Sequence, residues 1–405
     1  IRLLTGGLQV RVLLGEPSPF HDDGAEAASP RRRISADPAR VRAGRLSGRT
    51  AALGGVVLLP LLLFPLLFIA SRCVGSGGPT PVREASAATA AVEGYARPGA
   101  ATFLALPEWY VVYSAEEYAE AIGRGAPSRF PYFGAIRQFW RYYGGVCVTT
   151  RHRYPFSLRR HAALGATGMR FSVEQAVKGA YEKSLGRVVE WIGGHDTPED
   201  AFAARVAREY GRSLSTQPWY DFRFGTALEA LWKDVPARGP HPIRKWERRV
   251  ALSIEYGVKA LYGGAARVVL TYLSGAGDAG VYVLADNVSD RALVDARIQK
   301  VKAVGPHVYV LKLPPEPGFT RIVPGLVRQG VRFRDIAGNR EIFLTVRAPR
   351  TWGPGLAPGR LVLAEPILTD PGRQRAGIAT PVSSLHTVLA SLERSGATLE
   401  QLYAY

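Results

Sequence analysis

A run of 20 uncharged residues, from Ala51 to Ala70, constrains this 405-residue chain more than any other feature of its sequence. At about 1.5 Å per residue, a helix of that length reaches about 30 Å, the thickness of the hydrocarbon core of a bilayer. Pro60 and Pro65 lie within the run, and transmembrane helices tolerate internal proline. The run therefore predicts one transmembrane helix at residues 51–70.

The charges beside this run predict its orientation. Residues 31–50 hold seven arginines and residues 71–90 hold two. The positive-inside rule then places the N-terminus in the cytoplasm and the bulk of the chain outside, as a single-pass protein of the inner cell membrane. A cleaved signal peptide would need a better small-residue site than 74–76, and a lipoprotein would need a small residue where Arg72 stands.

Composition divides the rest of the chain into segments. Residues 1–50 are rich in Pro, Arg and Ala without sustained periodicity, and we expect a disordered cytoplasmic tail. The chain begins with Ile1 and its single methionine is Met169, so the true translation start stays open. Residues 74–100 are rich in small residues and are expected to be a linker.

Residues 101–273 carry helical patterns. Capping boxes begin at Ser114, Ser172 and Thr197. Two amphipathic stretches follow the 3.6-residue period. Their apolar stripes are Val173, Val177, Tyr181, Leu185, Val188 and Ile192 in the first, and Trp246, Val250, Ile254, Gly257, Leu261, Val268 and Tyr272 in the second. We expect a mostly helical middle domain.

After Gly275–Gly280 the pattern changes to strands. Strands are predicted at 281–285, 308–313, 331–336, 341–346, 360–368, 375–380 and 398–403, with helices at about 320–328 and 381–394. From Val308 the order is that of a ferredoxin-like split βαβ domain with an extra or broken strand. The expected fold class is therefore α+β: a transmembrane helix, a helical domain at 101–273 and a ferredoxin-like domain at 281–405.

Two resemblances accompany this pattern. The segment AGIATPVSSLHTVLASLERSGATLEQLYAY resembles the second half of an ACT-type regulatory domain, which implies a ferredoxin-like fold. The family's glycine at the strand-to-helix turn is missing, because Val382 and Ser383 stand there, so the resemblance implies no ligand residues. With LPEWYVVYSAEEYA and RFPYFGAIRQFW, the chain is also similar to uncharacterised bacterial single-pass membrane proteins, which implies no function.

The one glycine motif typical of cofactor binding lies between the wrong secondary-structure elements, and other catalytic motifs are missing from the sequence. The spacing of Gly275, Gly277 and Gly280 matches a dinucleotide fingerprint, but a helix is expected before it and a strand after it, the reverse of what pyrophosphate binding requires. The sequence lacks the nucleophile-elbow, zincin and P-loop patterns. None of the seven histidines pairs with Cys or an acidic residue at ligand spacing, so we expect neither a cofactor nor a metal.

Three residues are catalytic candidates. Glu108 precedes Trp109, and a carboxyl group buried beside apolar rings has the raised pKa that a general acid needs. His195 and Asp196 stand before a capped helix and could supply a general base. The alternative is that all three are surface or turn residues.

An aromatic and basic segment offers a binding surface. Between Phe103 and Tyr143, 12 of 41 residues are aromatic, and arginines are interleaved or follow. Rings beside arginines suit lipid headgroups or single-stranded nucleic acid, and an aromatic helical core is the third interpretation. The membrane-surface candidates are Trp109, Arg137, Trp140, Arg141, Arg151, Arg153, Arg159 and Arg160.

Charge and cysteine content complete the expectation. A net charge of +18 favours an anionic partner, either nucleic acid or anionic lipid. Cys73 and Cys147 could form one disulfide bond or remain two thiols. We expect a non-enzymatic assembly, sensing or scaffold component of the envelope, with the lipid bilayer as its partner. The alternatives are an extracytoplasmic enzyme, and third a cytoplasmic basic domain that binds nucleic acid or anionic lipid.

Overall fold

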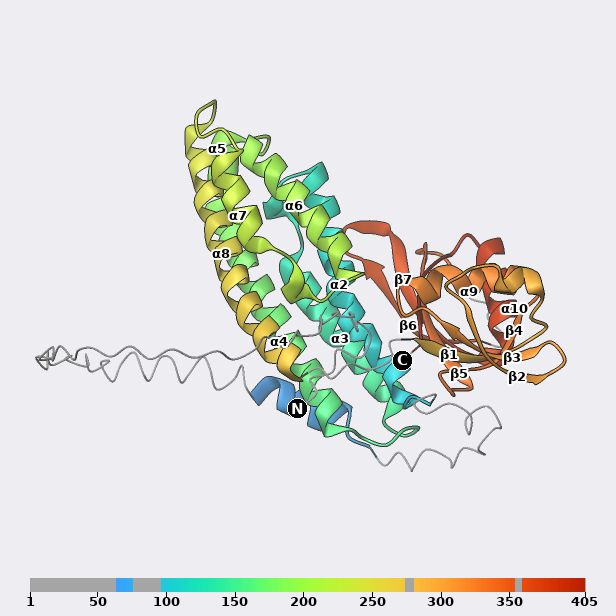
Figure 1. Ribbon diagram of the computed structural model, residues 1–405. Coiled ribbons are helices and arrows are strands. Elements are labelled where there is room, and N and C mark those ends of the chain that lie inside the picture. Colours follow the sequence, from blue (N-terminus) through green and yellow to red (C-terminus); the bar gives the residue numbers. More distant parts are fainter. Residues whose placement is uncertain (1–62, 76–95, 274–279, 354–358, 405) are drawn as a thin grey trace, which may run out of the picture. The chain divides into compact units, whose positions relative to one another are not determined.

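The computed structural model describes residues 63–75, 96–273, 280–353 and 359–404 (Figure 1). Helices occupy the chain up to Leu273, and strands with two helices follow, so the α+β class is confirmed. The predicted tail at 1–50, most of the linker at 74–100 and the glycines Gly275 and Gly277 lie outside the described residues.

The predicted transmembrane helix is corrected by the structure. Residues 51–62 of the run lie outside the described part, and residues 63–72 are helical. Within the described part of the chain, no helix is both long enough and apolar enough to cross a membrane. Ile69 and Cys73 are instead buried in a protein core, and the Phe68 ring lies 4.9 Å from that of Trp140. The single-pass anchor, the inner-membrane location and the orientation derived from them therefore lose their basis.

Between residues 100 and 273, the helical part contains seven α-helices and short connecting turns, in addition to the helix at 63–72. They are α2 (Ala100–Arg124), η2 (Pro127–Arg129), α3 (Tyr132–Thr150), α4 (Leu158–Tyr181), the π-helical turn η3 (Glu182–Gly186), α5 (Arg187–Gly193), α6 (Pro198–Leu214), η4 (Trp219–Asp221), α7 (Phe224–Lys233) and α8 (Pro242–Leu273). Thr197 caps α6 with a reciprocal capping box to Asp200, as predicted. Ser114 and Ser172 lie inside α2 and α4, so those two predicted starts are wrong.

Aromatic side chains form the core between α2, α3 and α4. Tyr110, Tyr142 and Phe139 are buried there, and the ring of Tyr110 lies 5.0 Å from that of Tyr142. Hydroxyl groups find partners inside this core, as when Tyr110 donates to Gln138 Oε1 at 3.0 Å. The interpretation of the 103–143 segment as an aromatic helical core therefore matches where most of its rings lie.

The β part contains two four-stranded sheets with the same topology. The first comprises β1 (Val281–Asp286), β2 (Gln299–Gly305), β3 (Val308–Leu313) and β4 (Arg332–Ile336), with η5 (Asp290–Leu293) after β1 and α9 (Gly318–Arg328) before β4. The second comprises β5 (Glu341–Pro349), β6 (Arg360–Ile367), β7 (Asp370–Pro381) and β8 (Thr398–Tyr403), with η6 (Val382–Ser384) and α10 (Leu385–Arg394) before β8. Their orders are β2-β3-β1-β4 and β6-β7-β5-β8.

This topology is a tandem βββαβ repeat. In each unit the first strand pairs antiparallel with both the third and the fourth, which makes those two strands parallel with a helix between them. The segments from α9 to β4 and from α10 to β8 align without gaps, and Gly330 and Gly396 fall at the same point, both with positive φ. The prediction of one ferredoxin-like domain is therefore wrong, because the strands assigned to it belong to two separate sheets.

The second sheet contacts both the β core and the helical part. Leu344 and Ile378 face a core that both sheets share with α9 and α10. On the opposite face, Phe343 and Tyr403 join the aromatic core of the helices, and the Tyr403 hydroxyl lies 3.0 Å from that of Tyr113 on α2. Alternation along β5 therefore sends successive side chains to two different cores.

Candidate docking surface

The predicted catalytic residues are not brought together. Glu108 is half-buried on α2, where burial raises the pKa of its carboxyl group to about 8, against the opposing charge of Arg160. His195 and Asp196 lie between α5 and α6; their side chains approach to 3.7 Å, and that of Asp196 is 93% exposed. No hydrogen bond or ion pair between described residues joins Glu108 to either of them.

The predicted membrane-surface residues are distributed over several environments. Trp109 and Trp140 are buried in the aromatic core, and the Trp140 indole donates to Ser172 Oγ at 3.0 Å. Arg141 and Arg153 pair with carboxylates of the β part. The remaining arginines are exposed or half-buried, namely Arg137, Arg151, Arg159 and Arg160.

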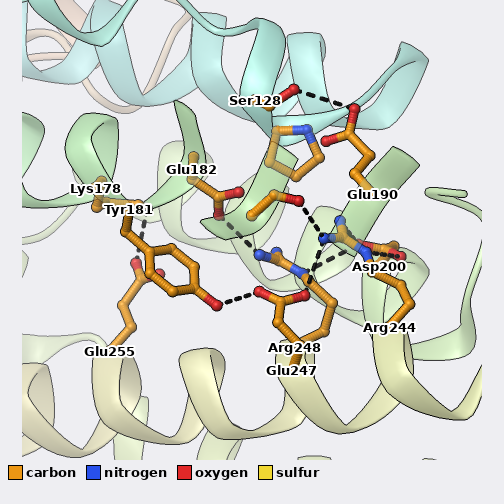
Figure 2. A network of polar contacts seen from close by, with 12 residues as sticks. Ser128, Lys178, Tyr181, Glu182, Glu190, Asp200, Arg244, Glu247, Arg248 and Glu255 are labelled. Carbon is orange, nitrogen blue, oxygen red and sulfur yellow. Dashed lines mark hydrogen bonds and ion pairs between the residues drawn. The ribbon is translucent and has the colours of Figure 1, made fainter. Parts of the chain in front are cut away.

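The interior between α6, η3 and α8 is charged. Arg244 and Arg248 on α8 are buried, and both contact Asp200 of α6, at 2.9 and 3.1 Å (Figure 2). Arg248 also lies 2.8 Å from Glu182, and Arg244 lies 2.9 Å from Glu247. Burial opposes the charge of Arg248, but the surrounding carboxylates outweigh burial and raise its pKa. Arg248 is therefore held charged away from water.

A second buried group of charges links α4 to α8. Lys259 lies 2.8 Å from Glu174 and 2.9 Å from Glu255, and Lys178 also contacts Glu255 at 2.9 Å. Burial would raise the pKa of Glu255, but the two lysines outweigh burial and lower it. The inward faces of α4 and α8 thus meet through ion pairs instead of aliphatic side chains.

The outward face of α8 is apolar. From residue 242 to 265, every exposed residue is Pro, Gly or apolar, whereas each Lys, Arg and Glu in that stretch is buried or half-buried. The exposed large side chains, which we name the α8 stripe, are Ile243, Trp246, Val250, Ile254, Val258 and Leu261. Leu261 is 78% exposed and Ile254 63%.

The helical segment from α4 to α5 has the same inverted character. Between residues 161 and 181 every exposed side chain is Ala or Val, and Arg170, Glu174 and Lys178 point away from solvent. Beyond the π turn the exposed large apolar side chains continue into α5. Together these form the α4–α5 stripe, comprising Val173, Val177, Leu185, Val188, Trp191 and Ile192.

Cations lie beside these stripes, and indole rings lie within or next to them. Lys183 and Arg187 are exposed beside Leu185 and Val188. Trp191 is 87% exposed on α5, and the half-exposed rings of Trp232 and Trp246 lie 6.2 Å apart. No carboxylate is exposed between 162 and 192 or between 242 and 265. The combined face is therefore apolar and cationic.

Sequence reasoning recognised both amphipathic stripes but not which side faces solvent. The sequence signal for the buried side was the complementary charge on the two helix faces that lie opposite the apolar stripes. Glu174 and Lys178 on one helix pair with Lys259 and Glu255 on the other, so these faces of the two helices lie toward each other. An apolar stripe opposite matched charges is hence a surface candidate as well as a core candidate.

One further group of donors lies apart from these stripes. Cys73 and Cys147, whose pairing the sequence left open, form a disulfide bond. His161 lies beside them, and these three form the single group in the described part of the chain with the donor types and spacing of a metal site.

Comparison of the chain with protein-family profiles, with curated proteins and with solved structures finds no match. The docking surface is thus defined by its own geometry.

Proposed function

We propose that this protein is a non-enzymatic assembly or scaffold component that docks on an anionic lipid surface through the α8 and α4–α5 stripes. The observation that carries the proposal is the inversion of α8, whose exposed residues from 242 to 265 are apolar while its charges are paired inside. The contact lies along the bilayer surface.

The physical case begins with exposed area. Half-exposed Ile, Leu, Val and Trp side chains gain on the order of 1 kcal/mol each when a contact covers them. The α8 stripe holds six such side chains. A contiguous apolar surface of this kind is typical of a protein or membrane interaction site.

The charge at the margin of the stripes selects lipid over a second copy of the chain. Helices that lie in the membrane interface combine aliphatic residues, Trp and Lys or Arg. Lys183 and Arg187 supply the cations, and the two stripes themselves, at 162–192 and 242–265, contain no exposed carboxylate to neutralise them in a dimer. Anionic headgroups do neutralise them, and indole rings favour the headgroup region.

Vesicle flotation with the full chain tests this proposal. We expect binding to phosphatidylcholine vesicles that contain phosphatidylglycerol, and weaker binding to phosphatidylcholine alone. Replacing Ile254 and Val258 together by Asp removes two exposed aliphatic side chains from the α8 stripe. The double variant should bind about tenfold or more weakly, because two lost contacts and two added negative charges act together.

The matched control is Thr216→Asp with Thr226→Asp, which adds the same two negative charges at exposed positions outside the stripes. It should bind vesicles nearly as well as the wild type. Binding through any other part of the chain would persist equally in both variants. Equal binding by both, or dimerisation in light scattering without vesicle binding, would overturn the lipid proposal, the latter in favour of a second copy.

A further inference from the structure

Three helical segments converge on one small group of sulfur and nitrogen donors. Cys73 follows the helix at 63–72, Cys147 lies on α3 and His161 lies on α4. One potential ligand atom from each lies within 4.8 Å of the others, and all three residues are buried. Two thiolates with one imidazole form a ligand set that suits Zn(II).

The surroundings hold the imidazole in place. Tyr143 lies one turn before Cys147 on α3, and its hydroxyl is 2.9 Å from His161 Nδ1. The Phe156 ring stacks on the imidazole, with the ring centroids 4.8 Å apart and the planes within 7°. A hydrogen bond to the second ring nitrogen and a packed ring are the features that orient metal-ligating histidines.

Space for a further ligand adjoins the group. A cavity of about 250 Å³ is lined by Cys73 and His161 together with Thr150, Tyr154 and Arg160 among others. Three protein ligands next to an open cavity match zinc sites in which the fourth position takes water or an exogenous ligand. Arg160 in the lining would favour an anion at that position.

We propose that Cys73, Cys147 and His161 form a redox-gated site for a thiophilic divalent cation such as Zn(II), in which the disulfide is the closed form and the dithiol binds the metal. Opening consumes one dithiol reductant. The S–S bond breaks, the reductant supplies two electrons and two protons and becomes a disulfide, and Cys73 and Cys147 become thiols. Zn(II) then displaces the two thiol protons into solvent and takes the imidazole as third ligand.

Metal titration of the full chain tests the site. The protein is reduced with dithiothreitol, which is then removed under nitrogen, and Co(II) is added as a spectroscopic probe, with Zn(II) in competition. We expect one equivalent of Co(II), a thiolate-to-cobalt charge-transfer band in the near ultraviolet, and its loss on adding Zn(II). The oxidised wild-type chain should show neither, and it is a control with no substitution.

Variants separate the ligands from their surroundings. Cys147→Ser should weaken binding about 100-fold or more and remove most of the charge-transfer band, whereas Tyr143→Phe should weaken it about tenfold and keep the band. His152→Asn, at an exposed histidine outside the group, should leave binding unchanged. Reduced wild-type protein that binds no Co(II), that binds it without a charge-transfer band, or that binds no better than the oxidised form would overturn the proposal.

Discussion

The layer between α4, α6 and α8 and the core of the β part bury opposite kinds of side chain. Between α4, α6 and α8 the interior holds paired Arg, Lys, Glu and Asp, and most of the large aliphatic side chains of α8 face outward. In the β part, Val283, Leu344 and Ile378 fill an aliphatic core that is closed to solvent. Burial of apolar side chains stabilises the β core, whereas the ion pairs of the helical interior lie beside a hydrophobic cluster that includes Leu252 and Tyr256 of α8.

This difference shows that the buried face of a helix has to be explained together with the surface that its outward face contacts. A buried ion pair is weak evidence for stability, since well-packed apolar residues often replace it without loss. The buried charges on the inward face of α8 therefore do not by themselves account for its apolar outward face. The docking that we propose accounts for this face, because an apolar partner surface removes the exposed Ile, Val, Leu and Trp side chains from water.

The largest expected effect comes from breaking the charged interior. Arg248→Met removes the partner of Glu182 and one partner of Asp200, and leaves buried carboxylates without full compensation. We expect the free energy of unfolding to fall by about 3–5 kcal/mol. Urea denaturation at pH 7 followed by circular dichroism measures it.

The control for this change is Arg187→Met, which removes an exposed arginine of α5 and should alter stability by less than about 0.5 kcal/mol. Adding Glu182→Leu to Arg248→Met should recover part of the loss, since it removes a carboxylate left unpaired. A loss below 1 kcal/mol for Arg248→Met would mean that water reaches this interior, and the contrast with the β core would fail.

The sequence predicted much of the fold but little of the surface. Turn glycines and alternation placed most strands of the β part, because aliphatic side chains there alternate toward the shared core. β2 was missed, since nearly all its side chains are exposed and its two valines do not set a pattern. The repeat was missed because pairing of β1 between β3 and β4 is a long-range property.

The docking surface was hidden for a different reason. Periodicity shows that a helix has two faces, but it does not show which one is buried. For α8 the answer depends on Glu174 and Asp200, which lie on other helices. Likewise Trp109 and Trp140 carry no local mark of burial, and only the tertiary packing of α2 against α3 places them in the core.

The contribution of one buried carboxyl group to stability should depend on pH with opposite signs in the two regions. In the helical part, lysine partners hold the pKa of Glu255 below its usual value, so its contribution to stability is present above about pH 4.5 and is lost as the pH falls further. In the β part, burial raises the pKa of Glu316 to about 7, so stability falls as the pH rises from about 4.5 to 7.

Two glutamine variants measure this contrast. Glu316→Gln should match the wild type near pH 4.5 and exceed its unfolding free energy by about 2 kcal/mol at pH 8, because the variant has no carboxyl group to ionise. Glu255→Gln should be less stable than the wild type at pH 7. The difference in unfolding free energy between the two should become smaller as the pH falls below 4. If the unfolding free energies of the two variants, relative to the wild type, changed with pH in the same direction, the two interiors would not differ in how they shift the pKa of a buried carboxyl group.

The smallest effect compares the two repeats of the β part with each other. Gly330 and Gly396 occupy equivalent positions after α9 and α10, with φ of 90° and 71°. Replacing either by Ala places a Cβ in the left-handed region, at a cost of about 1 kcal/mol. At Gly396 the new Cβ meets nothing within 4 Å, whereas at Gly330 it lies 3.1 Å from Asn287 Nδ2.

That neighbour also binds the glycine, because the Asn287 amide donates to Gly330 O at 2.9 Å. Gly330→Ala should therefore cost a few tenths of a kcal/mol more than Gly396→Ala in urea denaturation, since the amide has to shift. Adding Asn287→Ala should remove the difference between the two glycine variants. A larger loss at Gly396 would show that the two turns are not equivalent, and that the repeat is one of strand order without shared local energetics.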